Sequence, residues 1–385
     1  MKKNTVTGID YRTNEPILIE IENGCIANVS GCEPGVEPSA YLAPGLIDLQ
    51  INGYKGVDLN QLGLSVADVE TMTRMLWEQG VTTYLPTIIS NSDEGTESLL
   101  SMVALACKTI PEVAASIGGI HLEGPFLSPE DGPRGAHSKS YQKAPDWELF
   151  SRWQEATGGM IRIVTISPEW PGSDDFIRKC ANSNVVVSIG HTAASPEQIR
   201  QAIDAGATMS THLGNGSHLM LPRHPNYIWE QLASEKLWSG IIADGFHLPD
   251  AVLKVFLKVK PEKSILVSDA TSFAGLAPGV YSSHIGGEVE LSPEGRLCVK
   301  GNPKILAGSA QTILWCVNQL VNKGILPLKE AWNMASLKPK EFLQQATVDA
   351  FQIGARADLV LFSKNGNGVE ILQTIKSGMT VYSKD

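Results

Sequence analysis

Acidic and imidazole side chains lie at the ends of several short apolar segments in this sequence. Glu123 ends one such segment, and His191 and His212 end two later ones. His247 follows a fourth apolar segment, and Asp269 ends a fifth one. Each stands next to a glycine, a small residue or a turn, where a strand would stop. Because a charged group at the end of a buried strand is costly without a partner, we expect these side chains to have partners.

One carboxylate and two imidazoles that face a common axis form a divalent-metal site with an open position for water. Glu123, His191 and His212 are therefore the predicted ligands, and Asp269 could take the proton from that water. A single histidine at a strand end is more often a structural residue, and Asp269 alone could be a helix N-cap. The occurrence of all four groups at strand ends favours the metal site. Zinc is the expected ion, although iron, manganese or cobalt would also suit these ligands.

Eight apolar segments alternate with amphipathic ones in the middle of the chain. Helices are predicted between them, at residues 66–79, 94–108, 196–205 and 249–259. Eight strand-then-helix units predict an α/β fold, a (β/α)8 TIM-like barrel, whose strands end where catalytic groups gather. A doubly wound open sheet is the alternative, but no Gly-x-Gly-x-x-Gly follows the first strand. The predicted strands are 45–51, 82–89, 116–123, 161–167, 185–191, 208–212, 240–243 and 264–269.

The two chain ends are predicted to build a small β unit. Residues 17–21 and 25–29 flank Asn23-Gly24, which is a strong hairpin signal. The segments 357–362 and 380–382 are also strand-like. We therefore expect a small β-sandwich domain from residues 1–43 plus 350–385, and the catalytic barrel in 44–349. Residues 281–303 are expected to interrupt the last barrel unit with hairpin-like strands, followed by exterior helices at 311–322 and 328–335.

Composition excludes several classes of partner. The chain has 385 residues, 43% of them hydrophobic, and a formal net charge of −10, which argues against nucleic acid or an anionic membrane surface as the main partner. No segment is apolar over the length that a bilayer requires, and the N-terminus lacks a signal-peptide core. The six cysteines are scattered without zinc-ribbon or thioredoxin spacing. A reduced, cytoplasmic protein is expected.

Short sequence motifs occur in a fixed order over nearly the whole chain. They resemble the amidohydrolase superfamily and, within it, the N-acetylglucosamine-6-phosphate deacetylase family. The matching segments are 43–53 (APGLIDLQING), 121–126 (HLEGPF), 135–137 (GAH), 190–192 (GHT), 211–213 (THL), 242–247 (IADGFH), 266–271 (LVSDAT), 306–310 (LAGSA) and 353–360 (IGARADLV).

The resemblance implies a site with one metal ion. Many amidohydrolases carry His-x-His on the first strand, whereas this chain has Gln50 and Asn52 there. Neither amide is a strong zinc ligand, and no lysine suited to bridging two metals stands at the end of the fourth strand. Asp269 would then accept a proton from the attacking water and pass it to the leaving sugar amine. His137 resembles the family histidine that polarises the amide carbonyl or touches the sugar.

The resemblance also assigns substrate contacts to Asn215, Gly216, Arg223 and His247. These residues would bind an amino sugar phosphate, and Arg223 would reach it across the interface of a homodimer. An arginine suits phosphate because its planar fork donates two parallel hydrogen bonds, although an exposed surface cation is the simpler reading of Arg223. No role is assigned to His218 or His224 in the same loop, and His284 is expected on the surface.

The chain departs from the family pattern around the substrate. After His212 the family usually has an aromatic-Asn-Ala-Met run, whereas residues 213–222 read LGNGSHLMLP. Residues 225–230 (PNYIWE) bring large aromatics where small residues are expected, and the loop 128–134 is longer and more acidic than usual. These differences leave the predicted catalytic core intact but open the question of which sugar is bound.

The predicted function is metal-dependent hydrolysis of the acetamide of an N-acetylhexosamine 6-phosphate, with N-acetylglucosamine 6-phosphate as the leading substrate. A related deacylase acting on another amino sugar or an N-acyl amino acid is the alternative. A catalytically silent scaffold is a third possibility, but silent relatives typically lose ligands, and here the ligands and Asp269 are all present.

Overall fold

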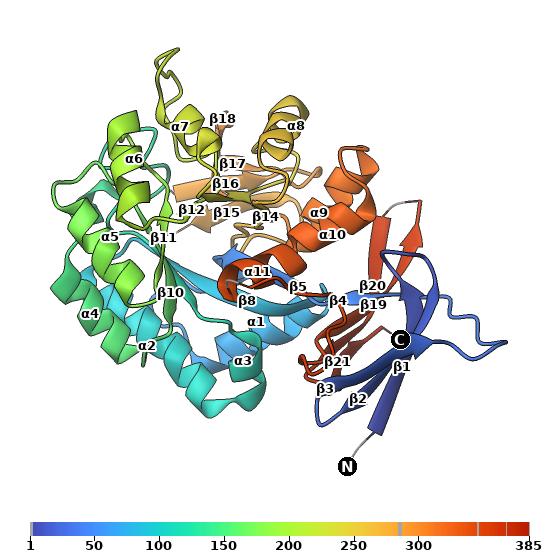
Figure 1. Cartoon of the computed structure of the whole chain (residues 1–385). Coiled ribbons are helices and arrows are strands. Elements are labelled where there is room, and N and C mark those ends of the chain that lie inside the picture. The colour runs from blue at the N-terminus through green and yellow to red at the C-terminus, as the bar shows by residue number, and fades with distance from the viewer. Residues whose placement is uncertain (1–2, 284–286, 345, 367, 385) are drawn as a thin grey trace.

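The computed structural model describes residues 3–283, 287–344, 346–366 and 368–384, and His284 lies outside them. Its centre is an eight-stranded parallel sheet in the order β14-β13-β12-β11-β10-β9-β8-β5 (Figure 1). A parallel bridge between Ile51 and Ala270 brings the two edges together, so the sheet closes into the predicted barrel. The strands are β5 Leu46–Ile51, β8 Val81–Ile89, β9 Ile120–Glu123, β10 Ile161–Ile166, β11 Val186–Ile189, β12 Met209–Ser210, β13 Trp238–Ile241 and β14 Ser264–Leu266.

The third predicted strand, 116–123, is wrong in its first half. Ser116 is the last residue of the short helix α3 Pro111–Ser116, and β9 begins only at Ile120. Pro111 occupies the start of this helix, where its missing N–H costs nothing, and Gly119 with φ of +139° then redirects the chain. An apolar run without helical period therefore contained a helix end, a turn and a strand.

Helices cover the outside of the barrel (Figure 1). Polar caps fix several of their starts: Ser65 and Ser195 form capping boxes with Asp68 and Gln198. The predicted 196–205 helix is confirmed as α6. The helices are α1 Val66–Trp77, α2 Asp93–Thr109, α3, α4 Trp147–Ala156, α5 Ser173–Asn182, α6 Pro196–Ala205, α7 Tyr227–Ala233, α8 Asp250–Val259, α9 Ile313–Asn322, α10 Leu328–Met334, α11 Leu337–Gln344 and the 3-10 turn η1 Lys139–Tyr141.

The barrel interior is a packed core rather than a pore. Buried aliphatic side chains from different strands form one cluster there, among them Leu49, Leu85, Ile163 and Ile265. The opposite faces of the same strands pack on the helices in the main core, which includes Leu122, Val164 and Ile241. The core thus fixes the strand ends, and with them any side chain that a strand end carries.

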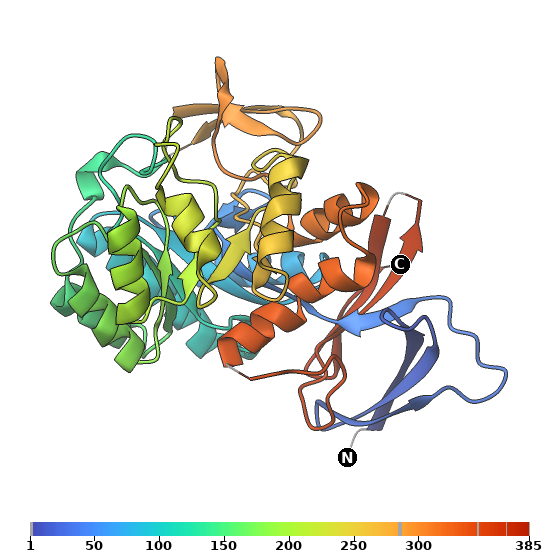
Figure 2. The ribbon, with the colours of Figure 1, turned by 45° about the horizontal axis from the view of Figure 1, so that its top comes forward.

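The two chain ends share one mixed sheet beside the barrel (Figures 1 and 2). Its strands run in the order β21-β20-β19-β4-β1-β2-β3, seven in all. Asn23 and Gly24 have φ of +52° and +80° and join β2 to β3, as the hairpin signal predicted. We propose that residues 1–43 plus 350–385 form this small domain, with the barrel in 44–349. The strands are β1 Lys3–Asp10, β2 Pro16–Glu22, β3 Cys25–Gly31, β4 Tyr41–Pro44, β19 Leu359–Asn365, β20 Gly368–Lys376 and β21 Met379–Ser383.

A four-stranded antiparallel sheet interrupts the last barrel unit after β14, which confirms the hairpin-like strands predicted in residues 281–303. Figure 2 shows it standing apart from the barrel at the top of the view. It is built from β15 Gly279–Ser283, β16 Gly287–Leu291, β17 Leu297–Val299 and β18 Asn302–Leu306. A separate two-stranded sheet, β6 Gly53–Tyr54 and β7 Val57–Asp58, follows β5.

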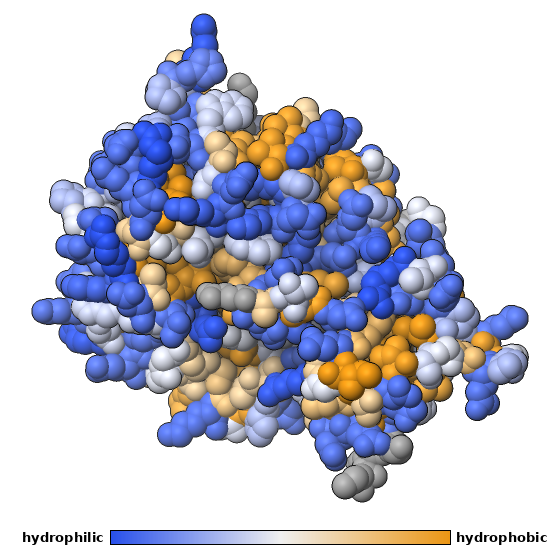
Figure 3. All heavy atoms as spheres, in the orientation of Figure 1, coloured by the Kyte–Doolittle hydropathy of each residue, from blue (hydrophilic) through white to orange (hydrophobic). Residues whose placement is uncertain are grey.

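The surface agrees with a fold whose apolar groups are mainly inside. Hydrophilic side chains dominate the face in Figure 3, with smaller hydrophobic areas between them. Among the described helices, none has the length and apolarity needed to cross a membrane.

Candidate metal centre and active site

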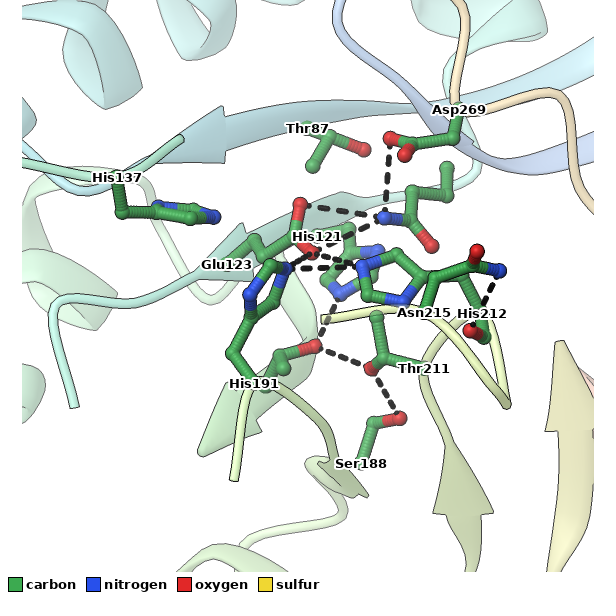
Figure 4. Close-up of polar contacts among 12 residues, drawn as sticks. Thr87, His121, Glu123, His137, Ser188, His191, Thr211, His212, Asn215 and Asp269 are labelled. Atoms are coloured by element: carbon green, nitrogen blue, oxygen red, sulfur yellow. Dashed lines mark hydrogen bonds and ion pairs between the residues drawn. The ribbon is translucent and has the colours of Figure 1, made fainter. Parts of the chain in front are cut away.

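Three side chains from neighbouring strand ends converge on one point (Figure 4). Glu123 is the last residue of β9, and His191 and His212 follow β11 and β12. Oε1 of Glu123 lies 3.3 Å from Nε2 of His191 and 3.1 Å from Nε2 of His212. The two Nε2 atoms are 3.0 Å apart, and all three residues are buried. The structure therefore brings together the three predicted ligands.

This donor set fits one divalent cation. Ligand bonds of about 2.0–2.1 Å in a tetrahedral arrangement place neighbouring ligand atoms roughly 3.3 Å apart, which is close to the separations seen here. The Nδ1–H of His191 donates to the carbonyl of Pro133 at 2.7 Å, so the Nε2 lone pair of His191 is directed into the cluster. The cluster could therefore hold a metal ion and leave a position for water or substrate.

The backbone at these positions is unusual. His191, His212 and Asp269 have φ of +49°, +27° and +48°, a region that residues other than glycine rarely adopt. Such conformations cost on the order of 1–3 kcal/mol each and persist where the surrounding structure fixes them. Three strained residues at the ends of three strands, all facing one point, mark this as a functional site.

Asp269 lies beside the cluster and is held by the amides of Gln50 in β5 and of Asn52 just after that strand. Nε2 of Gln50 donates to Oδ1 of Asp269 at 3.1 Å and to Oε1 of Glu123 at 3.1 Å, and Nδ2 of Asn52 donates to Oδ1 of Asp269 at 2.8 Å. Gln50 and Asn52, whose amides are weak zinc ligands, thus position the carboxylates of Asp269 and Glu123. Burial, followed by the negative charge of Glu123, raises the pKa of Asp269 to about 6. A carboxyl with a pKa near neutrality is suited to accept and return a proton.

His137 packs against the ligand cluster from the loop after β9. Its ring meets the ring of His191 edge to face, with 4.5 Å between centroids, and its Nδ1 lies 3.0 Å from Oγ of Ser90. Burial, with help from His191, lowers the pKa of His137 to about 3, so the imidazole is neutral. When the Ser90 hydroxyl donates to Nδ1, the hydrogen of His137 is on Nε2 and available to a substrate. Ser90 was missed in the sequence, although it directly follows a predicted strand.

His247 is oriented by an aspartate of its own motif. Oδ2 of Asp244 lies 2.7 Å from Nδ1 of His247, and Oδ1 accepts the backbone N–H groups of Phe246 and His247. Asp244 is buried, and its hydrogen bond with His247 overcomes the upward effect of burial and lowers the pKa of Asp244. Nδ1 of His247 is therefore occupied, and Nε2 has no hydrogen-bond partner among the residues that the structure describes. Asp244 was not predicted as a partner of His247, although it lies three residues before His247 in the segment 242–247.

The other predicted substrate contacts lie on the loop between β12 and α7. Nδ2 of Asn215 donates to the carbonyl of His212 at 3.1 Å. Gly216 has φ of +54°, and a Cβ there would lie 2.7 Å from Nδ1 of His191, so only glycine fits against that ring. Arg223 is exposed, and within the described chain no hydrogen bond or ion pair involves it. The structure thus places Asn215 and Gly216 at the cluster, whereas no hydrogen bond or ion pair among the described residues joins Arg223 to it.

Next to the cluster, a chain of buried polar groups runs between neighbouring barrel strands (Figure 4). His121 contacts the carbonyl of Leu49 through Nδ1 at 3.1 Å and Oγ1 of Thr165 through Nε2 at 2.7 Å. Thr165 continues to Thr211 at 2.7 Å, and Thr211 to Ser188 at 2.6 Å. Because Thr211 directly precedes His212, this chain supports a predicted ligand. The hydroxyls gave no sequence signal, since threonine and serine are common in strands.

Comparisons with known proteins show the family to which the chain is related. A model of the amidohydrolase family matches residues 41–381. The N-acetylglucosamine-6-phosphate deacetylase of Bos taurus is 32% identical over 89% of this chain and 83% of its own length, and that of Bacillus subtilis is 32% identical over 94% and 91%.

A solved structure extends the likeness to the fold. A mutant of the Mycobacterium smegmatis N-acetyl-D-glucosamine-6-phosphate deacetylase, in complex with N-acetyl-D-glucosamine-6-phosphate, superimposes with a TM-score of 0.86 at 26% identity and covers 100% of both chains. The chain therefore belongs to the amidohydrolase family and, within it, to the N-acetylglucosamine-6-phosphate deacetylases.

Proposed function

We propose that this protein is a metal-dependent deacetylase that hydrolyses the acetamide of N-acetylglucosamine 6-phosphate to the amino sugar phosphate and acetate. The observation that carries the proposal is the convergence of Glu123, His191 and His212 on one point with Asp269 beside them. Hydrolysis of an unactivated amide requires an activated water, a polarised carbonyl and a proton for the leaving amine, and this cluster offers a group for each.

The three ligands would hold one divalent ion, with zinc as the proposed metal because its preferred ligands are histidine and carboxylate groups. When bound, such an ion polarises a carbonyl and lowers the pKa of water. Asp269 accepts the proton of the attacking water and later donates it to the nitrogen of the leaving amine. Its hydrogen bonds from Gln50 and Asn52 hold the carboxylate in place for both steps.

His137 donates from Nε2 to the oxygen of the amide carbonyl, where negative charge develops during attack. Because burial keeps this imidazole neutral, it acts as a hydrogen-bond donor rather than as an acid. Ser90 selects the required tautomer by its contact with Nδ1. Both residues lie on segments that follow strands of the barrel, so the packed core supports their positions.

The sugar phosphate would contact Asn215, Gly216 and His247, with Arg223 supplied by the second subunit of a homodimer. The exposed position of Arg223 and its lack of a partner within the described chain suit a residue that acts across an interface. A cytoplasmic location is proposed from the lack of cysteine pairing among the described residues and from the chemistry of the substrate.

The test is acetate release by metal-loaded protein on four substrates: N-acetylglucosamine 6-phosphate, its galactosamine epimer, and both sugars without phosphate. We expect hydrolysis of N-acetylglucosamine 6-phosphate with a large preference over the unphosphorylated sugar. Activity on none of the four, with metal bound, would instead favour a deacylase for another N-acyl compound. A folded protein that binds no divalent ion would overturn the enzyme proposal altogether.

A further inference from the structure

Three segments that depart from the family pattern meet at one side chain, His218. Nε2 of His218 lies 3.0 Å from Oε2 of Glu130, which belongs to the loop after β9. Nδ1 of His218 lies 3.0 Å from the hydroxyl of Tyr227 at the start of α7. The backbone N–H of His218 also donates to that hydroxyl, at 2.9 Å. One residue thus joins the two loops that flank the metal centre.

The hydrogen-bond directions at His218 form a consistent set. The oxygen of Tyr227 accepts the backbone N–H of His218, so its own hydrogen is free to be donated to Nδ1. Nε2 then carries the ring hydrogen and donates it to the carboxylate of Glu130. Tyr227 is only 6% exposed, whereas the Glu130 side chain is 59% exposed. The contact with Tyr227 should therefore contribute more than the solvent-screened contact with Glu130.

The two joined loops both press on the ring of His191. The loop after β9 supplies the Pro133 carbonyl to Nδ1 at 2.7 Å, and a Cβ at Gly135 would lie 3.0 Å from Cε1. The loop after β12 supplies Gly216, where a Cβ would lie 2.7 Å from Nδ1. His191 is therefore held between the two loops, with bare backbone on both sides.

The loops also touch each other directly beside His218. Gly132 has φ of +95°, and a Cβ there would lie 3.1 Å from the Cα of His218. The segment between β12 and α7 rises from the barrel at the top of Figure 1, and His218 joins it to the loop after β9 through Glu130. His218 thus meets that loop with both its ring and its backbone.

We propose that His218 is a positioning residue that, with Tyr227 and Glu130, fastens the two loops around His191. This loop clamp (His218, Tyr227 and Glu130) retains a bound metal ion and aligns the substrate, and its effect on catalysis rests on the proposed function. His218 touches no reacting atom. Opening the clamp should therefore speed metal loss and weaken substrate binding, while the chemistry of bound substrate changes little.

The test removes one hydroxyl. Tyr227→Phe keeps the ring but eliminates both hydrogen bonds to His218. Tyr11→Phe is the matched control, because it removes a tyrosine hydroxyl that is bonded to Asn333 of α10 at 2.6 Å and lies just after β1. Zinc-loaded proteins are mixed with EDTA and zinc release is followed, and KM and kcat are measured with N-acetylglucosamine 6-phosphate. We expect about fivefold faster zinc release and about fivefold higher KM for Tyr227→Phe, as the loss of about 1 kcal/mol predicts, with kcat within about twofold.

Further variants separate the clamp from a general loss of stability. His218→Ala removes the ring contacts with both Tyr227 and Glu130, so its effect should be at least that of Tyr227→Phe. The double variant should be little worse than His218→Ala, because the ring contact with Tyr227 is already lost in that variant. His218→Asn, whose side-chain oxygen can replace Nδ1, should restore part of the zinc retention. Thermal unfolding should show all variants folded at the assay temperature.

The outcomes distinguish the two proposals. Zinc release and KM of Tyr227→Phe and His218→Ala within twofold of Tyr11→Phe would overturn the clamp, whatever the parent hydrolyses. Faster zinc release in a protein that fails to deacetylate the sugar phosphate would support the clamp and refute the proposed function. A parent protein that retains no zinc would overturn the clamp as stated.

Discussion

The two sides of the site are built differently. The proposed metal side consists of Glu123, His191 and His212, which are buried and stand at strand ends of the barrel. The proposed substrate side depends on the loop between β12 and α7, where Leu219 and Met220 are 98% and 90% exposed and Arg223 is also exposed. The barrel core positions the first group, whereas the second is positioned by contacts between loops.

This difference separates chemistry from specificity. Residues on packed strands have few alternative positions, so the metal side is expected to keep its geometry with any substrate. Loop residues can change without disturbing the core, so the expected departure from the family pattern at residues 213–222 and 225–230 would leave the strand ends unaffected. Substitutions on the two sides should therefore have different kinetic signatures.

The largest effect is expected from Asp269→Asn, on the metal side. The amide keeps the shape of the carboxylate but cannot accept the proton of water, so kcat should fall by roughly 10²–10⁴-fold. Metal content and KM should change little, which emission spectrometry and steady-state kinetics would measure. A near-normal kcat would remove Asp269 from proton transfer.

On the substrate side, Arg223→Ala should act on binding alone. Loss of a charge-assisted contact to phosphate, worth about 1.5–3 kcal/mol, should raise KM for N-acetylglucosamine 6-phosphate roughly 10–100-fold. Hydrolysis of unphosphorylated N-acetylglucosamine serves as the control and should be unaffected. An equal effect on both sugars would place Arg223 outside the phosphate site.

The pH profile tests the metal side without any substitution. Burial and the charge of Glu123 raise the pKa of Asp269 to about 6, and the deprotonated form is the one that accepts a proton. The value of kcat/KM should therefore decline as the pH falls, approaching about tenfold per pH unit. A bound cation favours the carboxylate and moves this decline to pH 6 or below. Residual activity of Asp269→Asn should lack the decline, and a kcat/KM that rises on acidification would contradict the assignment.

The smallest effect is expected from Ser90→Ala, which removes only the hydrogen bond between the Ser90 hydroxyl and Nδ1 of His137. Without the hydroxyl, the tautomer with hydrogen on Nε2 is no longer favoured, and kcat should fall about fivefold, in line with one hydrogen bond. Ser90→Thr keeps the hydroxyl and should restore most of the rate. Equal rates in the Ala and Thr variants would show that Ser90 does not orient His137.

The sequence predicted the barrel and the metal side because both leave strong local signals. Apolar segments that end in Glu123, His191 and His212 combine strand length with an uncommon residue at the strand end. The beginning of the third strand was wrong because Pro111 starts a helix inside an apolar run. The local pattern of apolar residues alone cannot distinguish a buried strand from an apolar run that contains the end of a helix.

Contacts between distant segments had no such signal. The bonds from Gln50 to Asp269, from Ser90 to His137 and from His218 to Glu130 join residues far apart in the chain. Serine, glutamine and a surface histidine are common in any loop or strand, so only the folded arrangement reveals these partners. The residues that support the catalytic groups were therefore harder to predict than the groups themselves.

The central claim is that one divalent ion is held by Glu123, His191 and His212. The most direct measurement is the equilibrium metal-to-protein ratio of the parent chain and of the double variant His191→Ala/His212→Ala, with His224→Ala as a control on an exposed histidine. We predict one equivalent in the parent and the control and none in the double variant. Two equivalents in the parent, or one retained in the double variant, would contradict the account.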